Sequence, residues 1–274
     1  MHIIDISSYE PHIDWDMVAR EVDFVILRAS VGMNKDKKYL EFTTAMDQRN
    51  IPYHAYHYVK ATDIELAKTE ASIFAEATSG TKPLFYIIDA EYANIEAKNA
   101  RPIMEAFEEE LRKLKGSRIQ VALYIGHHLY EKWNLDYSRY AYIWIPRYGT
   151  NSGNPEKLPK YPCDLWQYTD KGHINGIKED VDLNQLTGSK SLSFFMTKPI
   201  TLRHTLKKGN RGGNVKELQK ILIDKGYNIG YYGVDGDFGD ATEAAVKEFQ
   251  RDHELVIDGI VGKKTWEKIY ENLG

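Results

Sequence analysis

Short apolar runs alternate with amphipathic segments along the first two thirds of the chain. Apolar runs bounded by polar residues predict buried strands, and apolar positions three or four residues apart predict helices. The predicted strands are 2–6, 22–30, 51–60, 84–91, 121–125, 140–146, 163–168 and 180–183. The predicted helices are 15–20, 38–50, 63–78 and 100–115. Asp14 and Asp63 are suited to cap two of these helices.

The order of these elements predicts the fold. Strand and helix alternate about five times and strands then follow one another, which indicates a mainly parallel sheet with crossover helices. About eight strands favour a barrel, although a regular (β/α)₈ barrel typically takes about 250 residues. We therefore predict an α/β fold with an irregular (β/α) barrel of about eight strands. An open doubly wound sheet is the alternative, but no Gly-x-Gly-x-x-Gly motif follows the first strand.

The pattern changes after residue 187. Residues 188–201 are rich in Ser, Thr and Lys, which predicts a linker between a first domain at 1–187 and a second at 202–274. In the second domain, the sequence Asp-Gly-Asp-Phe-Gly at 235–239 recurs as Asp-Gly-Ile-Val-Gly at 258–262. The repeats are too short for EF-hand calcium loops. Apolar positions predict a small all-α module of three helices with its own core.

The strand predicted at 84–91 ends in two carboxylates. Asp89 and Glu91 are two residues apart, so they project to the same side at the carboxyl end of the strand. Barrels and open α/β sheets carry their active sites at this end. A core strand has no structural reason to end in two acids, because each needs a partner or a shifted pKa. The alternative is a strand that reaches solvent and ends in ordinary loop acids.

Other predicted strand ends add two more acids, one base and several aromatic side chains. These residues are Asp5, Arg28, Tyr56, Tyr58, Tyr124, Trp166, Tyr168 and Asp182. Acids mixed with aromatic rings suit a site for a neutral sugar chain. Glycoside hydrolysis needs a protonated carboxyl for the leaving oxygen and a second carboxylate for the developing positive charge. Repulsion between close carboxylates would keep Glu91 protonated near neutral pH.

Composition argues against several other classes of function. The 274-residue chain has a formal net charge of −4, so it lacks the basic footprint of a nucleic-acid or membrane-surface protein. No apolar run reaches the roughly 18 residues of a membrane span. The N-terminal sequence lacks the basic and apolar regions of a signal peptide. We expect no nucleic-acid partner, no membrane insertion and synthesis in the cytoplasm.

Metal and thiol chemistry receive little support. His54 and His57 fall on opposite faces of a predicted strand, and His127 and His128 are adjacent, so neither pair suits chelation of one metal. The single cysteine, Cys163, excludes an internal disulfide. We expect no metal and no cofactor. A metal-dependent polysaccharide deacetylase remains an alternative because Asp and His residues are mixed at the strand ends.

Taken together, the strand-end motifs resemble family 25 of the glycoside hydrolases, the Chalaropsis-type lysozymes common among phage endolysins. In the order of the family, they are Asp5-Ile6-Ser7, Ile26-Leu27-Arg28-Ala29-Ser30, Tyr56-His57-Tyr58, Asp89-Ala90-Glu91, Trp166-Gln167-Tyr168 and Val181-Asp182-Leu183-Asn184. The resemblance covers about residues 1–187. It implies the irregular barrel and a muramidase that cleaves the β-1,4 bond between N-acetylmuramic acid and N-acetylglucosamine in bacterial peptidoglycan.

The resemblance also implies roles for single residues. Glu91 matches the proton donor, and Asp89 matches the partner that orients the substrate acetamido group or stabilises charge. Asp5 and Asp182 match two further pocket acids. The expected substrate-binding residues are Arg28, Tyr56, Tyr58, Tyr124, Trp166 and Tyr168. We hypothesise a substrate-assisted route, because an orienting acid lies beside the donor on one strand.

The C-terminal module resembles the peptidoglycan-binding domain of cell-wall hydrolases. The matching segments are 206–209, 215–219, 235–239, 242–246 and 249–250, within about residues 202–273. This resemblance implies a wall anchor for an endolysin-like enzyme, which would be made in the host cytoplasm and act on the wall after release. We expect a monomer or a weak homo-oligomer. A wall-binding protein whose barrel has lost activity is the alternative.

Overall fold

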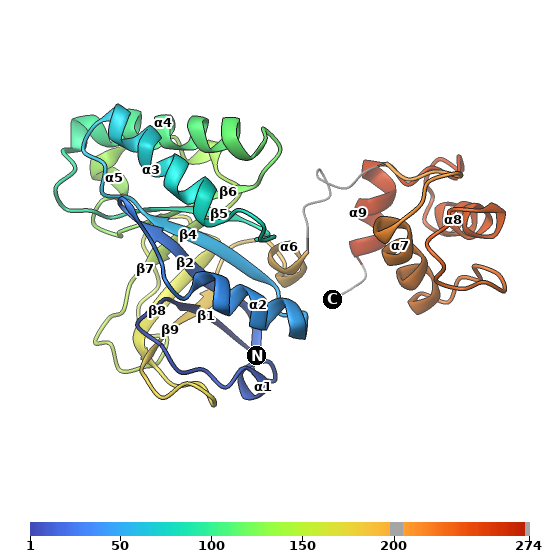
Figure 1. Cartoon of the computed structure of the whole chain (residues 1–274), viewed down its shortest axis with the longest axis horizontal. Helices are drawn as coiled ribbons and strands as arrows, with labels where there is room; N and C mark the ends of the chain where they lie inside the picture. The colour runs from blue at the N-terminus through green and yellow to red at the C-terminus, as the bar shows by residue number, and fades with distance from the viewer. Residues whose placement is uncertain (198–204, 272–274) are drawn as a thin grey trace. The chain divides into compact units, whose positions relative to one another are not determined.

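The computed structural model describes residues 1–197 and 205–271. The chain divides into two compact units, Met1–Thr197 and Lys198–Gly274 (Figure 1). Residues 198–201 of the predicted linker and residues 202–204 and 272–274 of the predicted second domain lie outside the described residues.

The strands of the first unit form one mixed sheet that closes into a barrel. They are β1 (His2–Ile6), β2 (Val22–Val31), β3 (Asn34–Lys35), β4 (Tyr53–Tyr58), β5 (Tyr86–Ala90), β6 (Val121–Ile125), β7 (Ile143–Pro146), β8 (Leu165–Gly172) and β9 (Val181–Leu186). Their order is β1-β9-β8-β7-β6-β5-β4-β2-β3, and β1 also pairs with β2. This last pairing closes eight strands into a barrel, while β3 extends the sheet as an additional strand. The predicted irregular barrel is confirmed, and the open sheet is excluded.

The barrel is mostly parallel, except at its last strand. β9 runs antiparallel to both β8 and β1, and β3 runs antiparallel to β2. An antiparallel neighbour needs no crossover helix, whereas parallel strands do. This is why β8 and β9 follow each other directly and why the barrel needs fewer residues than a regular (β/α)₈ fold.

Helices cover the outside of the barrel, as Figure 1 shows for α2, α3 and α4. The helical segments of the first unit are α1 (Trp15–Val18), α2 (Tyr39–Arg49), α3 (Ile64–Ala77), α4 (Ala97–Lys115), α5 (Tyr130–Trp133), the 3₁₀ helix η1 (Tyr137–Arg139) and α6 (Leu192–Met196). Asp14 accepts hydrogen bonds from the backbone amides of Asp16 and Met17, and Asp63 accepts one from Leu66. Both predicted helix caps are therefore confirmed.

Strand alternation divides the core of the first unit into two layers. On β2, Val25 and Leu27 face the helices, whereas Phe24, Ile26 and Arg28 face the barrel interior. The interior is apolar and aromatic near the amino ends of the strands and polar at their carboxyl ends. The apolar interior core therefore packs under the polar side chains, between them and the amino ends of the strands.

Helix α6 corrects the linker prediction. Phe195 is fully buried, with ring centroids 5.6 Å from Phe24 and 5.1 Å from Tyr142. The Phe195 carbonyl accepts a 2.8 Å hydrogen bond from His54 Nε2, so His54 Nδ1 accepts the 2.9 Å bond from the Tyr142 hydroxyl. Burial lowers the pKa of His54 to about 3, which keeps the ring neutral. Residues 192–196 therefore cover the amino end of the barrel, because their two phenylalanines outweigh the polar composition around them.

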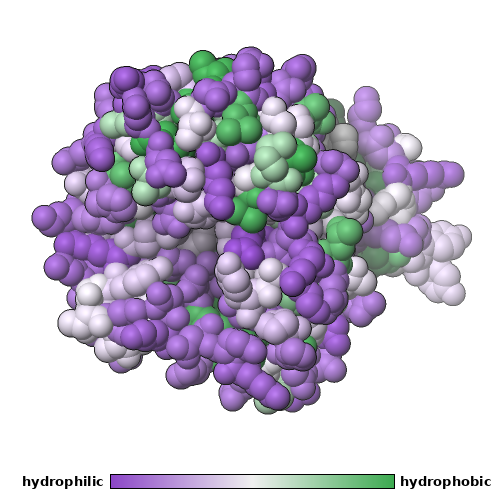
Figure 2. Space-filling model, turned by 60° about the vertical axis from the view of Figure 1, so that its left-hand side comes forward, coloured by the Kyte–Doolittle hydropathy of each residue, from purple (hydrophilic) through white to green (hydrophobic). Residues whose placement is uncertain are grey.

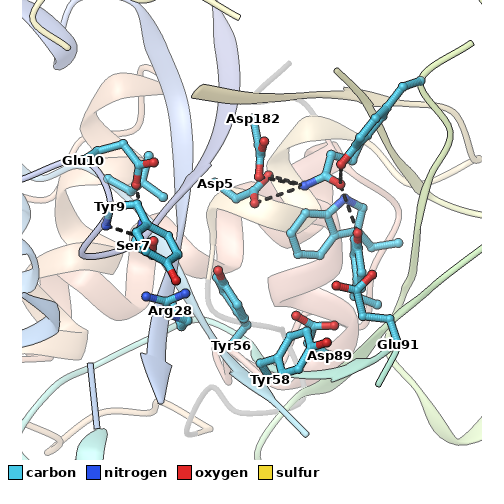
Figure 3. Close-up of a pocket in the computed structure, with 15 residues that line it drawn as sticks. Asp5, Ser7, Tyr9, Glu10, Arg28, Tyr56, Tyr58, Asp89, Glu91 and Asp182 are labelled. Carbon is cyan, nitrogen blue, oxygen red and sulfur yellow. Dashed lines mark hydrogen bonds between the residues drawn. The ribbon is translucent and has the colours of Figure 1, made fainter. Parts of the chain in front are cut away.

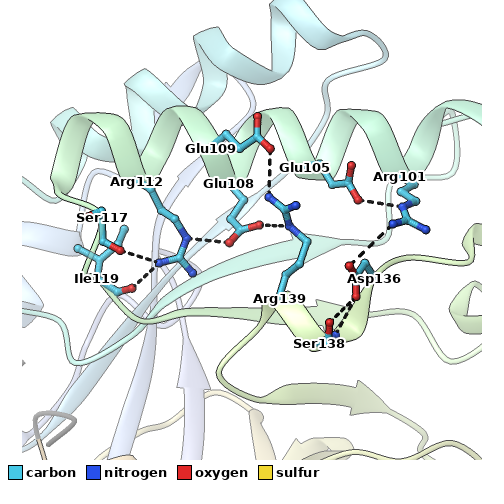
Figure 4. Close-up of polar contacts among 10 residues, drawn as sticks. All are labelled: Arg101, Glu105, Glu108, Glu109, Arg112, Ser117, Ile119, Asp136, Ser138 and Arg139. Atoms are coloured by element: carbon cyan, nitrogen blue, oxygen red, sulfur yellow. Dashed lines mark hydrogen bonds and ion pairs between the residues drawn. The ribbon is translucent and has the colours of Figure 1, made fainter. Parts of the chain in front are cut away.

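A buried acid connects α4 to the loops beside it. Glu108, whose side chain is 3% exposed, lies 2.7 Å from Arg112 Nε and 2.6 Å from Arg139 Nε (Figure 4). Arg112 also donates to the carbonyl oxygens of Ser117 and Ile119. Two guanidinium groups compensate the buried carboxylate, so removal of either one would leave a poorly paired charge inside.

The second unit consists of helices around a separate core. Its helices are α7 (Gly213–Asp224), α8 (Asp240–Asp252) and α9 (Lys263–Glu271). The buried apolar side chains include Val215, Leu218, Leu222, Phe238, Val246, Phe249 and Trp266. The predicted small three-helix module is confirmed.

The internal repeat forms the same hydrogen-bond network twice. Gln219 Nε2 donates to Asp235 Oδ1 at 2.8 Å and to Thr242 Oγ1 at 3.1 Å, and Gln219 Oε1 accepts from the Gly236 amide at 2.8 Å. In the second copy, Gln250 makes the corresponding bonds at 2.9, 3.3 and 2.9 Å, with the residues Asp258, Thr265 and Gly259. The repeated Asp-Gly sequence therefore builds a turn around a buried glutamine.

The face of the molecule shown in Figure 2 is largely hydrophilic. Figure 2 shows one face, on which hydrophobic residues form small scattered patches among polar ones. Across residues 1–197 and 205–271, no helix combines the length and the apolar character that a membrane crossing requires.

Candidate active site

The carboxyl ends of the barrel strands surround a pocket of about 270 Å³. Its lining residues are Asp5, Ile6, Ser7, Tyr9, Glu10, Arg28, Tyr56, Tyr58, Asp89, Glu91, Tyr124, Trp144, Tyr148, Gln167 and Asp182. Eight of the ten residues that the sequence predicts for the site lie here. Figure 3 shows Asp5, Asp182, Asp89 and Glu91 turned toward the pocket from three different strand ends.

Asp89 and Glu91 stand at the end of β5. Asp89 is 6% exposed, and its Oδ1 atom is buried without a hydrogen-bond partner among the described residues. Burial, together with the negative charges of Glu91 and Asp5, raises the pKa of Asp89 well above its usual range. Burial and the charge of Asp5 also raise the pKa of Glu91, and the nearby Tyr124 hydroxyl opposes this rise. The pair therefore retains a proton at a pH where exposed acids are ionised.

Asp5 and Asp182 are directly opposite each other in the antiparallel pairing of β1 and β9. Burial raises the pKa of both acids, and the negative charge of Asp5 contributes to the rise at Asp182. Asn184 Nδ2 donates to Asp5 Oδ2 at 2.8 Å, and this bond favours the ionised form of Asp5. The geometry therefore places an ionised Asp5 beside a protonated Asp182.

Gln167 connects these acids to the aromatic wall. Its amide nitrogen is 3.0 Å from Asp5 Oδ2 and 3.2 Å from Asp182 Oδ2. Its carbonyl oxygen accepts hydrogen bonds from the hydroxyls of Tyr124 at 3.0 Å and Tyr148 at 2.7 Å. The nitrogen and the oxygen of the Gln167 amide are therefore both hydrogen-bonded. These bonds fix the Gln167 side chain together with the two carboxyls and the two tyrosine hydroxyls around it.

Arg28 forms part of the opposite wall. Its Nε atom is 2.9 Å from Asp36 Oδ2, and its guanidinium carbon lies 4.8 Å from the centre of the Tyr9 ring. Glu10 accepts a 2.8 Å hydrogen bond from the Ser7 amide, and burial raises its pKa. Because Arg28 is already paired with Asp36, it compensates the pocket acids only in part, which agrees with their raised pKa values.

Trp166 and Tyr168 do not line the pocket, so the structure does not bring them together with the other eight predicted site residues. Both side chains belong to the core between the strands and the helices, and Trp166 Nε1 donates to the Arg147 carbonyl at 2.8 Å. Side chains alternate along β8, so the intervening Gln167 faces the barrel interior. The alternation rule applied to the segment Trp166-Gln167-Tyr168 would have identified either Gln167 or the two rings, never all three.

Several pocket residues were not predicted. They are Ile6, Ser7, Tyr9, Glu10, Trp144, Tyr148 and Gln167. Trp144 lies two residues before the end of β7 and could have been found from strand alternation. Tyr9, Glu10 and Tyr148 lie in loops, where no periodicity indicates the direction of a side chain.

The described part of the chain holds no group of three or more His, Cys, Asp and Glu side chains arranged to bind a metal ion. His54 and His57 are both buried, and they point to opposite sides of β4. His54 contacts the barrel interior, whereas His57 lies 3.0 Å from Glu70 on α3. What the pocket offers is acid chemistry: protonated and ionised carboxyls beside tyrosines and a tryptophan.

Comparisons with known proteins agree with this chemistry. The sequence model described as glycosyl hydrolases family 25 matches residues 4–177, and the model described as putative peptidoglycan binding domain matches residues 211–269. An autolytic lysozyme of Clostridium acetobutylicum is 27% identical over 96% of this chain and 76% of its own length.

Two solved structures resemble the first unit. One is GHIP, a glycosyl hydrolase 25 of Streptococcus pneumoniae, with 28% identity and a TM-score of 0.66 over 71% of this chain and 90% of that one. The other is the catalytic domain of the endolysin ply40 from bacteriophage P40 of Listeria monocytogenes. It has 27% identity and a TM-score of 0.66 over 72% of this chain and 98% of that one.

Proposed function

This chain belongs to family 25 of the glycosyl hydrolases, and we propose that it is a muramidase. Its substrate would be the β-1,4 bond between N-acetylmuramic acid and N-acetylglucosamine in bacterial peptidoglycan. The observation that carries this proposal is the pair Asp89 and Glu91, two carboxyls with raised pKa values in a pocket at the strand ends. Glycoside cleavage needs a carboxyl that is still protonated near neutral pH.

Glu91 is the proposed proton donor. It is more exposed than Asp89 and follows the last residue of β5, so it reaches further toward the opening of the pocket. Proton transfer from Glu91 to the glycosidic oxygen lets the bond to the anomeric carbon break. The Glu91 carboxylate then accepts a proton from the water that attacks the anomeric carbon in the second step.

Asp89 is the proposed partner in a substrate-assisted route. Its buried Oδ1 lacks a donor among the described residues, and the N–H of a substrate acetamido group would supply one. That hydrogen bond would stabilise the Asp89 anion, so the proton of the pair would pass to Glu91. It would also orient the acetamido oxygen for attack on the anomeric carbon as the glycosidic bond breaks. The acetamido group would then serve as the internal nucleophile.

The second unit is proposed to anchor the enzyme on the cell wall. Its match to a peptidoglycan binding domain supports this role. A tethered anchor raises the concentration of substrate near the barrel without any change in its chemistry. The relatives include a bacterial autolytic lysozyme and a phage endolysin, so the bacteriophage origin and the release from a host cytoplasm stay predictions.

Analysis of reaction products tests the proposal. Purified cell walls would be digested, reduced with borohydride and examined by mass spectrometry. We expect reduced muramic acid at the new chain ends, and no such ends with Glu91→Gln. Reduced glucosamine ends would show a glycosidase that cuts the other bond. Deacetylated sugars in uncut chains would instead indicate a deacetylase, and intact walls would indicate a binding protein.

A further inference from the structure

A second pocket, of about 520 Å³, lies in the C-terminal unit. It is bounded by the segment after α7, which carries Tyr231 and Tyr232, and by the first turn of α8. The acidic residues that line it are Asp235, Asp237 and Asp240. Figure 1 shows α7 and α8, the two helices that border this segment of the chain.

Tyr231 and Tyr232 are more exposed than a folded core requires. Their exposed fractions are 98% and 82%, and the ring centroids are 5.6 Å apart with planes at 80°. Neither ring belongs to the hydrophobic core of the second unit. Two large, adjacent, exposed rings on the rim of a pocket are a stacking surface for a ligand.

The charges beside the rings favour a neutral ligand. Asp237 lies 2.8 Å from Arg211 Nη2, and Asp240 pairs with Lys208. These cations compensate two of the three acids, so the rim does not present a strong field for a cationic peptide. The carboxylate oxygens are still acceptors for hydroxyl and amide donors. Flat rings beside such acceptors suit sugar rings with N-acetyl groups.

The second copy of the repeat shows that the fold does not need this pocket. Gln250 builds the same turn as Gln219, yet Ile260 stands where the first copy has Asp237. In the second copy, Glu254 and Leu255 stand at the positions in register with Tyr231 and Tyr232. The aromatic pair is therefore an addition to the first copy. Val256 and Ile257, which are 76% and 49% exposed, provide a control pair of exposed apolar side chains in the second copy.

We propose that the Tyr231–Tyr232 pocket binds the glycan strand of peptidoglycan. A sugar ring would stack on the tyrosines, and its hydroxyl or acetamido groups would donate to the aspartates of the rim. The proposal rests on the wall-anchoring role proposed above and names its ligand as the N-acetylated sugar chain rather than the stem peptide. The pocket would hold the glycan without cutting it, since it lacks a buried acid pair.

Nuclear magnetic resonance of the full chain carrying Glu91→Gln tests the choice of ligand. Chitotetraose and a synthetic stem peptide would be titrated separately against protein with labelled tyrosines. We expect the ring signals of Tyr231 and Tyr232 to shift with chitotetraose and to stay unchanged with the peptide. Shifts with the peptide alone, or with neither compound, would overturn the proposal.

Binding to purified cell walls from which teichoic acids have been removed tests the role. In the Glu91→Gln background, Tyr231→Ala with Tyr232→Ala should weaken sedimentation with the walls about tenfold, because stacking on both rings is lost. Val256→Ala with Ile257→Ala should leave it unchanged. Equal loss in both variants would contradict the assignment. Product analysis of the wild type reports on the barrel alone, so failure of the muramidase proposal would be visible separately.

Discussion

The side-chain nitrogen of Gln167 lies 3.1 Å and 3.0 Å from the two carboxylate oxygens of Asp5, a residue 162 positions away in the sequence. β8 and β1 are not neighbours in the barrel, because β9 lies between them. The contact therefore spans β9 on the interior face of the barrel. Since Gln167 also accepts a hydrogen bond from Tyr124, it connects the Asp5 side of the pocket to the Glu91 side.

Substitution of Gln167 by Leu should impair catalysis without direct loss of a reacting group. Asp5 would lose a buried donor, and the hydroxyls of Tyr124 and Tyr148 would lose their common acceptor. An unpaired buried polar group costs about 1–3 kcal/mol, which corresponds to a fall in kcat of about 5- to 160-fold. If Gln167 had a purely structural role, its substitution would lower the amount of folded enzyme and leave the pH profile of kcat unchanged. We instead expect the profile of kcat to shift.

The matched control is Tyr168→Phe, which changes the neighbouring position of β8. The Tyr168 side chain faces the helices, so loss of its hydroxyl should leave kcat and KM within about twofold of wild type. Steady-state kinetics on soluble peptidoglycan fragments checks both variants. A large loss of activity in Tyr168→Phe would contradict the placement of Tyr168 outside the site.

Two substitutions should move the alkaline limb of the pH profile in opposite directions. The charge of Asp5 raises the pKa of Glu91, and the nearby Tyr124 hydroxyl lowers it. Asp5→Asn should therefore let Glu91 lose its proton at lower pH, and Tyr124→Phe should let it keep the proton to higher pH. Activity needs protonated Glu91, so the limb should move to lower pH in the first variant and to higher pH in the second. Rates of wall-fragment cleavage from pH 4 to 9 measure both shifts, and movement in the same direction would exclude Glu91 as the titrating donor.

Much of the barrel was predictable because its strands are regular and buried. Asp89 and Glu91 were found from alternation on a single strand, and the pairing of β1 with β9 then brought Asp5 opposite Asp182. That pairing is long-range, so the sequence could indicate the acids but not which two would share a proton. Trp166 lies away from the pocket because consecutive residues of its motif alternate between the two faces of β8.

Other features depended on packing that leaves no local signal. Phe195 lies in a polar segment, yet it fills the amino end of the barrel beside His54. Tyr9 lines the pocket from a loop, where its ring contacts Arg28. In both cases the deciding interaction is with a residue distant in the sequence, so neither periodicity nor composition could indicate it.

The buried acid Asp182 should lower the stability of the folded protein near neutral pH. Burial raises the folded-state pKa of Asp182 to about 10, above the value of about 4 for an unfolded chain. Between these values the folded state binds more protons than the unfolded state, so stability falls as pH rises, at up to about 1.4 kcal/mol per pH unit. The asparagine side chain of Asp182→Asn cannot ionise, so this variant does not lose stability in this way as pH rises. We expect a higher Tm than wild type at pH 7 and lower activity.

Thermal unfolding followed by circular dichroism at pH 4 and pH 7 checks this expectation. The advantage of Asp182→Asn should shrink toward pH 4, where about half of the Asp182 carboxyls are protonated in the unfolded wild type too. Asp180→Asn, which alters an exposed acid two residues away, should show no such trend. An advantage of the same size at both pH values would mean that the gain comes from packing rather than from ionisation.

The two glutamines of the C-terminal repeat should be equally important for its stability. Gln219 and Gln250 are each 1% exposed, and each donates to an aspartate, a threonine and a backbone carbonyl. Replacement of either by Ala should leave several of these groups unpaired and lower the free energy of unfolding of this unit by about 2–3 kcal/mol. Lys220→Ala, at an exposed position next to Gln219 on α7, should change it by less than about 0.5 kcal/mol. Denaturant unfolding of the full chain measures these effects, with hydrogen exchange of the amides in α7 and α8 as the probe of this unit. If only one of the two substitutions lowered the free energy of unfolding, the two repeats would contribute unequally to stability despite their matching geometry.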